Sequence, residues 1–472
     1  MLSSQSKMRN AKKSWNKIAI INLVSTIVLQ GIAFFSAPIF SRLLGTSNYG
    51  IISVYRTWVS LAATILSLQL ASTIANARAS FNSEDQEKYQ SSVMSLSILV
   101  YGMLSILVLI VCVILSNYMS INILMVVCVL FQGLGTYLVN TLNSKLTYEF
   151  KANKNALIAI VLSVGNIVFS LIFVLLLDKD NNYWGKIFGE LLINILVGLI
   201  GYVLIFHKGK TFYNKEYWKF TIPIALPTIF HLLANIILSQ SDKLMLQKFL
   251  GNSSVGVYAM AFTFASIMST IYGALNNTWV PFYFEYTKYR QLDEVKKHAR
   301  NYVELYTIIS CGFILLSREV FHIIADKSYW NGTSYIVVFA VGLYMVFLYS
   351  FPVNFEFYYK KTILIAIGTT LAAICNIYLN YIFIRVYGAI GAVLATTISY
   401  ILQFIFHYIC AQRIIKEEFP YSMKIFLPGI GIVYTVAIFS LLSQSYIIIR
   451  WLLAGGIGIY LLKKIYSRKS LF

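Results

Sequence analysis

Long apolar runs separated by short polar segments dominate the pattern of hydrophobic and polar residues along the chain. Fourteen runs are long enough to span a membrane, because about 20 apolar residues in a helix cross the hydrocarbon core. They cover residues 18–41, 51–76, 93–116, 121–142, 156–177, 186–206, 221–241, 255–280, 301–322, 335–357, 362–384, 388–411, 425–443 and 446–462. The runs do not alternate polar with apolar residues as strands of a membrane barrel do. The sequence therefore predicts an all-α polytopic membrane protein with 14 transmembrane helices.

Composition supports this fold class and excludes several others. Of 472 residues, 58% are hydrophobic and only 12% are charged. A soluble globular chain carries about 25% charged residues, and a disordered chain needs low hydrophobicity. The five cysteines all lie inside apolar runs without a CxxC pair, so we interpret them as packing residues: Cys112, Cys128, Cys311, Cys375 and Cys410. No phosphate-binding loop, metal-ligand cluster or nucleophile elbow is present, so no cofactor or metal is expected.

The basic residues predict the orientation in the membrane. The net charge is +20, yet the 38 Lys and Arg residues are scattered in small groups, which does not indicate a nucleic-acid-binding domain. With a cytoplasmic N-terminus, the inside segments hold 28 of them, and the other ten lie in the outside segments or within the runs. Short basic loops stay on the cytoplasmic side, so both termini are expected inside. Every expected outside loop is short, which leaves no room for a soluble catalytic domain.

An internal repeat relates the two halves of the chain. Residues 41–50 align with residues 247–256 at an offset of 206, and Leu44, Gly45, Ser47 and Gly50 are identical to their counterparts. Each copy joins the first and second helix of a set of six, so the two sets are expected to have the same orientation. Such parallel repeats are typical of transporters with a central site between two bundles. We expect lobes at 1–206 and 207–411, followed by two additional helices and a tail at 412–472.

Several motifs in this order resemble those of bacterial polysaccharide-biosynthesis flippases of the multidrug/oligosaccharidyl-lipid/polysaccharide exporter superfamily. They are Pro38–Gly45 with Tyr49 and Gly50, Leu66–Leu70 with Arg78, Ser241–Leu246 with Leu250 and Gly251, Val255–Tyr258, Asn376–Asn380, Tyr387–Ala392 and Ala395–Ser399. The resemblance covers essentially the whole chain. Gln69 departs from it, because the family often has glycine at this position.

The resemblance implies a function that composition alone does not reach. It implies two six-helix lobes around a central cavity that opens alternately to each side. The expected substrate is an oligosaccharide repeat unit on undecaprenyl diphosphate, moved from the inner to the outer leaflet of the bacterial cytoplasmic membrane. Capsule, O-antigen or exopolysaccharide assembly would use the product, with a polysaccharide polymerase and chain-length machinery as partners. The protein is expected to be a transporter and not an enzyme.

Arg56 is the most unusual polar residue, because an ionisable group within a membrane span is costly and marks a candidate cavity site. An arginine can hold a diphosphate through two hydrogen bonds at once. The alternative is a structural ion pair, with Glu190 in the sixth run as the candidate partner. Arg78 matches the arginine of the family pattern and is expected either to receive the diphosphate at the inner mouth or to anchor the helix at the interface. Arg42 and Lys248 occupy equivalent positions in the two repeats, as release-side contacts or interfacial anchors.

The seventh run combines helix-breaking residues with a polar face. It contains Pro223 and Pro227, and the spacing of His231, Asn235 and Asp242 places these three on one face of a helix. Broken helices with polar faces line transporter cavities. This face is therefore a candidate site for a coupling ion, H⁺ or Na⁺, and hydrogen bonding between helices is the alternative.

Other functions are less consistent with these features. A peptidoglycan-precursor flippase or an ion-coupled drug or metabolite exporter of the same superfamily is expected to carry different first-helix and loop signatures. A membrane polysaccharide polymerase usually needs a large outer loop with catalytic arginine or histidine, which this chain lacks. A purely structural bundle would not need Arg56 or the polar face of the seventh run.

Overall fold

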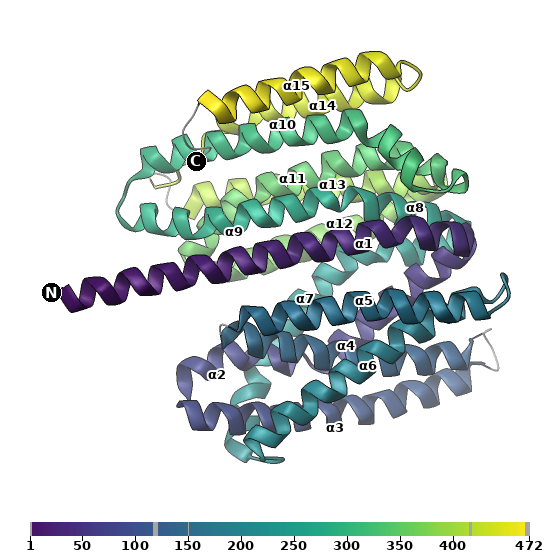
Figure 1. Ribbon diagram of the computed structural model, residues 1–472, viewed down its shortest axis with the longest axis vertical. Coiled ribbons are helices and arrows are strands. Elements are labelled where there is room, and N and C mark those ends of the chain that lie inside the picture. The colour runs from purple at the N-terminus through teal and green to yellow at the C-terminus, as the bar shows by residue number, and fades with distance from the viewer. Residues whose placement is uncertain (1, 117–120, 150, 415–417, 468–472) are drawn as a thin grey trace. The chain divides into compact units, whose positions relative to one another are not determined.

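The computed structural model describes residues 2–116, 121–149, 151–414 and 418–467, and side chains between residues 31 and 463 except those of 33–35, 79, 83 and 231. Within these ranges the secondary structure is helical, which confirms the predicted all-α fold class (Figure 1). The α-helices are α1 Leu2–Ile65, α2 Ile74–Ser80, α3 Ser83–Ser116, α4 Ile123–Tyr148, α5 Ala152–Leu176, α6 Asn182–Gly209, α7 Lys215–Leu250, α8 Asn252–Ala265, α9 Ile267–Lys288, α10 Leu292–Ile324, α11 Thr333–Tyr358, α12 Thr362–Tyr387, α13 Ala389–Ile414, α14 Met423–Leu442 and α15 Ile447–Ser467. Two short 3₁₀ helices, η1 Leu70–Thr73 and η2 Lys327–Gly332, precede α2 and α11.

The described residues contain 11 helices that are long and apolar enough to cross a membrane, or up to 12 with one bent pair. These helices coincide with the expected spans from the second to the thirteenth. The first expected span, 18–41, falls mostly on residues whose side chains lie outside the described ones. The last, 446–462, coincides with α15. Hydrophobic run length therefore located the helices that the described part of the chain contains.

Two breaks shape the first part of the chain. The span expected at 18–41 and residues 51–65 of the next one belong to one long α1, which is interrupted at Gly45 with φ 66° and ψ 175°. A second break follows Ile65, where Leu68 and Gln69 both have positive φ, at 49° and 47°. The helix axis bends by 54° between Ser36–Ile65 and Leu70–Arg78. The expected second helix is therefore a bent span.

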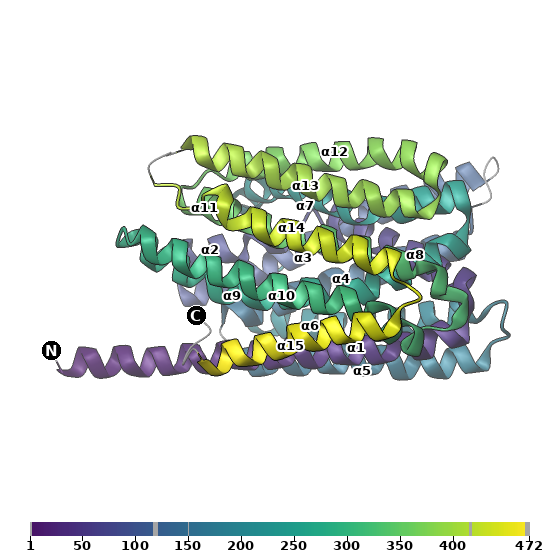
Figure 2. The ribbon, with the colours of Figure 1, turned by 90° about the horizontal axis from the view of Figure 1, so that it is seen from above.

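The chain divides into two compact units. Unit 1 comprises residues 1–36 and 51–236, and unit 2 comprises residues 37–50 and 237–472. In unit 1, α6 packs against α3, α4 and α5; in unit 2, α11 and α12 pack against α13, and α14 and α15 pack along α10 (Figures 1 and 2). All three boundaries fall inside helices, two in α1 and one in α7. The lobe boundaries expected from the sequence stay a prediction.

The backbone supports the internal repeat at its most diagnostic position. Gly45 and Gly251, 206 residues apart, have nearly the same conformation, with φ 66° and 81° and ψ 175° in both. Residues with a side chain rarely adopt these φ and ψ angles, so glycine is required at both breaks. The two repeat copies therefore make the same helix break.

Candidate functional site

Arg56 forms a partly buried ion-pair cluster with two residues of α6 in unit 1. Its Nε donates to Glu190 Oε2 at 3.1 Å, and its Nη2 donates to Oε1, so the contact is bidentate. Lys186 Nζ lies 3.4 Å from the same Oε1. Both predicted residues, Arg56 and Glu190, are thus brought together, and the cluster also contains Lys186, which sequence analysis missed.

Two glycines allow α6 to approach α5 closely beside this cluster. A Cβ atom added to Gly185 would lie 2.5 Å from Val174 N, and one added to Gly189 would lie 2.5 Å from Ser170 Cα. Small residues four apart bring membrane helices into backbone contact. As a result Lys186 Nζ reaches Ser170 Oγ, at 3.3 Å. The Gly185–Gly189 spacing therefore holds Lys186 in the interior of unit 1.

The cluster is positively charged and open on one side. The Glu190 side chain is 7% exposed, whereas the Arg56 side chain is 45% exposed. Two cations and one carboxylate leave a net positive charge on these three side chains. A guanidinium that a carboxylate holds on one side, and that is exposed on another, can bind an anion in a fixed orientation.

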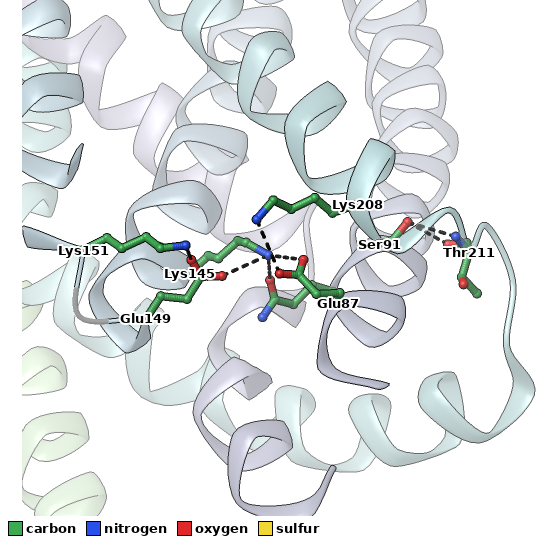
Figure 3. A network of polar contacts seen from close by, with 8 residues as sticks. Glu87, Ser91, Lys145, Glu149, Lys151, Lys208 and Thr211 are labelled. Carbon is green, nitrogen blue, oxygen red and sulfur yellow. Dashed lines mark hydrogen bonds and ion pairs between the residues drawn. The ribbon is translucent and has the colours of Figure 1, made fainter. Parts of the chain in front are cut away.

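Arg78 lies at the end of unit 1 where α2 and α4 terminate. Its guanidinium donates to the carbonyl of Tyr148, the last residue of α4. Close by along α4, Lys145 is buried and donates to Glu87 at 2.7 Å and to Gln90 at 2.6 Å, and it pairs with Glu149 at 3.2 Å (Figure 3). This network joins α3 and α4 at the end that the charge pattern places in the cytoplasm.

The same network continues to α6 and to the start of the α4–α5 connection. Lys208 lies 3.7 Å from Glu87, and Lys151 lies 2.5 Å from Glu149 (Figure 3). Burial raises the pKa of Glu149, but the hydrogen bond from Lys151 and the attraction of Lys145 outweigh burial and hold its pKa below the ordinary value. Glu149 is therefore an ionised member of a network with more cations than carboxylates.

Asp242 is the centre of a second polar site, which lies in unit 2. Its side chain is buried and accepts hydrogen bonds from Asn380 Nδ2 at 2.7 Å, from Thr396 Oγ1 at 2.7 Å and from the Tyr258 hydroxyl. Asn376 extends the network by accepting from Asn380 at 2.9 Å. A carboxylate in a membrane span is thus surrounded by neutral polar groups from α8, α12 and α13.

The donor set around Asp242 fits a monovalent cation. Asn380 Oδ1 is buried and has no hydrogen-bond partner among the described residues. Ser241 Oγ donates to Asn376 Oδ1 at 3.1 Å. Carboxylate, amide and hydroxyl oxygens are ligands for hard cations, whereas softer metals prefer nitrogen and sulfur. The described residues hold no group of three His, Cys, Asp or Glu side chains suited to a transition metal.

The other predicted site residues lie elsewhere. The unit boundary inside α7 separates Asp242 in unit 2 from Asn235, which is exposed, and from His231, whose side chain lies outside the described residues. Arg42 is exposed and donates to the carbonyl of Ile323 at 3.4 Å, near the end of α10. Lys248 is exposed in the last turn of α7.

An apolar groove runs along α10, α14 and α15 in unit 2. Its volume is 730 Å³, and most of its lining is apolar, with Leu452 and Leu453 among the lining residues. Arg300 and Lys424 line it near the ends where α10 and α14 begin. Glu304 also lines it, so the groove combines an apolar channel with two basic groups and one carboxylate.

Sequence reasoning overlooked part of both polar sites, although signals were present. Lys186 and Glu190 are four residues apart, which on a helix makes them neighbours. Asn376 and Asn380 have the same spacing, and they begin and end one of the motifs that resemble the flippase family. Two amides one turn apart in a membrane span indicate a polar contact, but the sequence does not identify Asp242 as that contact.

Comparisons with known proteins identify the family of this chain and proteins with a similar fold. A family model described as "Polysaccharide biosynthesis protein" matches residues 15–287. "Lsg locus putative protein 1" of Haemophilus influenzae is 25% identical over 376 residues, which cover 76% of this chain and 88% of that protein. An "Uncharacterized membrane protein" of the same organism is 23% identical over 400 residues, which cover 82% and 92%.

Solved structures share the fold at low sequence identity. The lipid II flippase MurJ in its inward closed conformation has a TM-score of 0.69 and 18% identity, covering 94% of this chain and 99% of that one. An inward-facing multidrug resistance MATE family transporter of the MOP superfamily has a TM-score of 0.63 and 17% identity, covering 84% and 98%. The family and the fold are of transporter and flippase types, which confirms the resemblance identified from the motifs. The chain belongs to the polysaccharide biosynthesis protein family and has the fold of MOP-superfamily transporters.

Proposed function

We propose that this protein moves an undecaprenyl-diphosphate-linked oligosaccharide repeat unit from the inner to the outer leaflet of the bacterial cytoplasmic membrane by alternating access. The product supplies capsule, O-antigen or exopolysaccharide assembly, with a polymerase and chain-length machinery acting next. Both termini lie in the cytoplasm, and the protein catalyses no covalent reaction. Membership of the polysaccharide biosynthesis protein family and the flippase-type fold support this proposal.

The exposed guanidinium of Arg56 is the observation that carries the proposal. Glu190 fixes its orientation through two hydrogen bonds, and Lys186 adds a second positive charge. A diphosphate presents several anionic oxygens to such a site. Because membrane interiors screen charge weakly, this cluster attracts a diphosphate strongly without any contact to the sugar. A flippase for many repeat units needs this kind of recognition.

The groove along α10, α14 and α15 supports a lipid-linked substrate. Its apolar lining suits a polyprenyl chain, and the net positive charge of Arg300, Lys424 and Glu304 suits an anionic headgroup. A polar, water-soluble metabolite would need neither feature. The groove therefore favours a lipid-linked substrate over a soluble one.

The Asp242 network supports coupling to an ion gradient. Of the two ions that the sequence suggests, an oxygen-only donor set favours Na⁺. Asp242 would supply the negative charge, while Thr396, Asn376 and Asn380 would supply neutral oxygens. Because these residues come from three helices, a bound cation would hold those helices together and favour one conformation of unit 2.

Reconstitution tests the proposed function directly. The purified full-length chain is placed in vesicles that contain an undecaprenyl-diphosphate-linked oligosaccharide in both leaflets, and an impermeant glycosidase is added outside. Flipping makes more of the oligosaccharide accessible than in protein-free vesicles, and Arg56→Ala vesicles serve as the matched control. Lipid II and a fluorescent drug are tested in parallel. Translocation of either one, with none of the oligosaccharide, would overturn the proposal.

A further inference from the structure

Arg385 lies in the last turn of α12 and is held by two aromatic rings. Its Cζ atom is 3.9 Å from the centre of the Tyr381 ring and 5.0 Å from the centre of the Phe249 ring of α7. Among the described residues, this guanidinium takes part in no hydrogen bond or ion pair. Stacking on a ring orients a guanidinium and leaves its N–H groups free to bind an oxyanion. Arg385 is also exposed, so an anion from outside the chain can reach it.

Arg385 has no acidic neighbour on its own helix or on α13. The sequences of both helices contain no Asp or Glu. On α7, Asp242 is buried and already accepts three hydrogen bonds. The charge pattern places this end of α12 outside, where basic residues are uncommon. An exposed arginine without a carboxylate at this boundary therefore indicates an anion that the membrane supplies.

The exposed face of α12 leads from the middle of the helix to Arg385. Its side chains are spaced three or four residues apart, which places them on one side of the helix. They are 44% to 64% exposed and comprise Ile367, Leu371, Ile374, Tyr378 and Tyr381. Aliphatic side chains come first, then tyrosines, and then the arginine. A phospholipid presents its acyl chains, its interfacial region and its phosphate in the same order, and tyrosines are enriched at that interface.

An apolar cleft lies between α12 and α13 on this face. It has a volume of 190 Å³ and is lined by Leu371 and Cys375 of α12 and by Leu402 and Phe406 of α13, with Gln403 as a polar residue. Leu371 is 51% exposed and Leu402 is 43% exposed, so the cleft opens on the exposed face. An apolar cavity of about 150 Å³ holds one benzene molecule, so this cleft accommodates part of an acyl chain.

The cleft lies at the depth where an acyl chain of one leaflet ends. Along a helix, Cys375 and Leu371 lie about 15 and 21 Å from Arg385, at about 1.5 Å per residue. Half of the hydrocarbon core is about 15 Å thick. A phosphate at Arg385 therefore places the end of a phospholipid acyl chain at the cleft. An undecaprenyl chain is several times longer and would extend past it.

We propose that unit 2 binds an anionic phospholipid, such as phosphatidylglycerol, in the leaflet that meets the outer end of α12. The phosphate accepts hydrogen bonds from Arg385, and one acyl chain runs along Tyr378 and Ile374 into the cleft between α12 and α13. A zwitterionic headgroup would add an ammonium group, for which α12 and α13 offer no carboxylate. The protein retains this lipid and does not move it, so the site is independent of the proposed function.

Photocrosslinking locates the lipid on the full-length protein. The purified chain is placed in phosphatidylcholine vesicles that contain a small fraction of phosphatidylglycerol with a photoactivatable group near the end of one acyl chain. After illumination, mass spectrometry identifies the crosslinked peptides. We expect crosslinks concentrated on the peptides that contain Leu371 to Cys375 or Leu402 to Phe406. Crosslinks spread evenly over the exposed apolar faces of α3, α5 and α12 would overturn the proposal.

Variants at Arg385 test the contact with the phosphate. Arg385→Gln should lower crosslinking at the cleft about tenfold, because charge-assisted hydrogen bonds to the phosphate are lost. Lys179→Gln is the matched control, since Lys179 is exposed, is related to Arg385 by the offset of 206 and has Asp178 and Asp180 beside it in the sequence. An equal effect of the two variants would exclude Arg385 as the phosphate ligand.

Tyr381→Leu covers the case in which Arg385→Gln does not fold. It keeps the charge but removes the closer ring, and it should lower crosslinking about threefold, the effect of one cation–π contact at an exposed site. Full crosslinking by Tyr381→Leu would contradict a site built on the stacked guanidinium. Melting temperatures of all variants verify the fold.

Competition in the parent protein identifies the source of the phosphate. Excess unlabelled phosphatidylglycerol should reduce crosslinking at the cleft, whereas additional phosphatidylcholine should not. Undecaprenyl phosphate is tested in parallel. Competition by undecaprenyl phosphate alone would assign the site to the carrier lipid, against the proposal. Equal competition by phosphatidylcholine would show that the headgroup charge is not recognised and would also overturn it. None of these measurements involves glycan transport, so a failed lipid site and a failed flippase assignment give different results.

Discussion

Gly50 and Gly256 lie against each other's repeat copy in a reciprocal contact. A Cβ atom on Gly50 would overlap the carbonyl oxygen of Asn252, and one on Gly256 would overlap the carbonyl oxygen of Thr46. The offset of 206 converts Gly50 into Gly256 and Thr46 into Asn252, so the same contact is made twice. The Thr46 and Ser253 hydroxyl groups lie 2.7 Å apart beside it. The two repeat copies therefore meet around a local two-fold axis in unit 2.

Adding a methyl group at this crossing should destabilise the protein. Gly50→Ala and Gly256→Ala should each lower the free energy of unfolding by about 1–3 kcal/mol, the usual effect of overpacking, because backbone atoms must move apart. The measurement is the melting temperature of the purified protein in detergent. Gly312→Ala is the matched control, because a Cβ on Gly312 has nothing within 4 Å. If all three variants melted alike, the crossing would not be close-packed.

The helices were predictable from the sequence because hydrophobic run length follows directly from membrane thickness. The breaks were less predictable. Gly45 was conspicuous in the repeat, but nothing local indicated that Gln69 adopts a left-handed conformation. This conformation occurs at the position where the family often has glycine, so the departure affects the backbone as well as the packing.

Contacts within the polar sites were predictable only where both partners are residue types that are rare in membrane spans. Arg56 and Glu190 are ionisable residues in membrane spans, and the sequence suggested their pairing although 134 residues separate them. Asn380 and Thr396 are ordinary polar residues, 138 and 154 residues from Asp242. Their convergence depends on how α12 and α13 pack, which no local pattern encodes.

Replacing Gln69 with glycine should stabilise the bend after α1. Gln69 has φ 47°. This left-handed conformation costs a residue with a side chain about 1–2 kcal/mol, whereas the cost for glycine is smaller and entropic. We expect Gln69→Gly to raise the free energy of unfolding by about 0.5–1 kcal/mol. Gln291→Gly is the control, because Gln291 has φ −85° and gains no such relief. A lower melting temperature for Gln69→Gly than for Gln291→Gly would contradict this expectation.

Arg56 should be essential for export even when its buried partner is neutralised. Arg56→Ala should reduce surface glycan per membrane-inserted protein by about 10- to 100-fold, the loss of a charge-assisted contact, and Arg56→Lys should retain part of the activity. Arg78→Ala should be milder, because screening is stronger near the aqueous boundary.

The double variant Arg56→Ala/Glu190→Gln separates substrate binding from structure. It removes the negative charge of Glu190, which Arg56→Ala leaves paired with Lys186 at 3.4 Å, so it removes the need to neutralise Glu190 without restoring the guanidinium. If Arg56 binds the diphosphate, export should stay low in the double variant. Recovery to the parental level would show that Arg56 serves only to neutralise Glu190.

Sodium should stabilise the protein through Asp242. At a concentration about 100 times Kd, a bound ion adds about 2.7 kcal/mol to the free energy of unfolding. The melting temperature should therefore rise in sodium chloride relative to potassium chloride at equal ionic strength. Asp242→Asn should abolish the difference, and Thr396→Val should move it to higher sodium concentrations. A sodium effect of full size in Asp242→Asn would exclude this carboxylate as a ligand.

Filling the groove between α10, α14 and α15 should block a polyprenyl substrate while sparing the fold. Gly456 lines the groove, and a Cβ there meets nothing within 4 Å, so the side chain of Gly456→Leu starts from open space. Gly455 is equally open but does not line the groove, which makes Gly455→Leu a matched control on the same helix. Because a chain that cannot enter the groove loses its apolar contacts, Gly456→Leu should lower flipping of the undecaprenyl-linked oligosaccharide at least about fivefold, the equivalent of about 1 kcal/mol. Melting temperatures should match in the two variants. Equal flipping by both variants would show that the lipid chain does not use this groove.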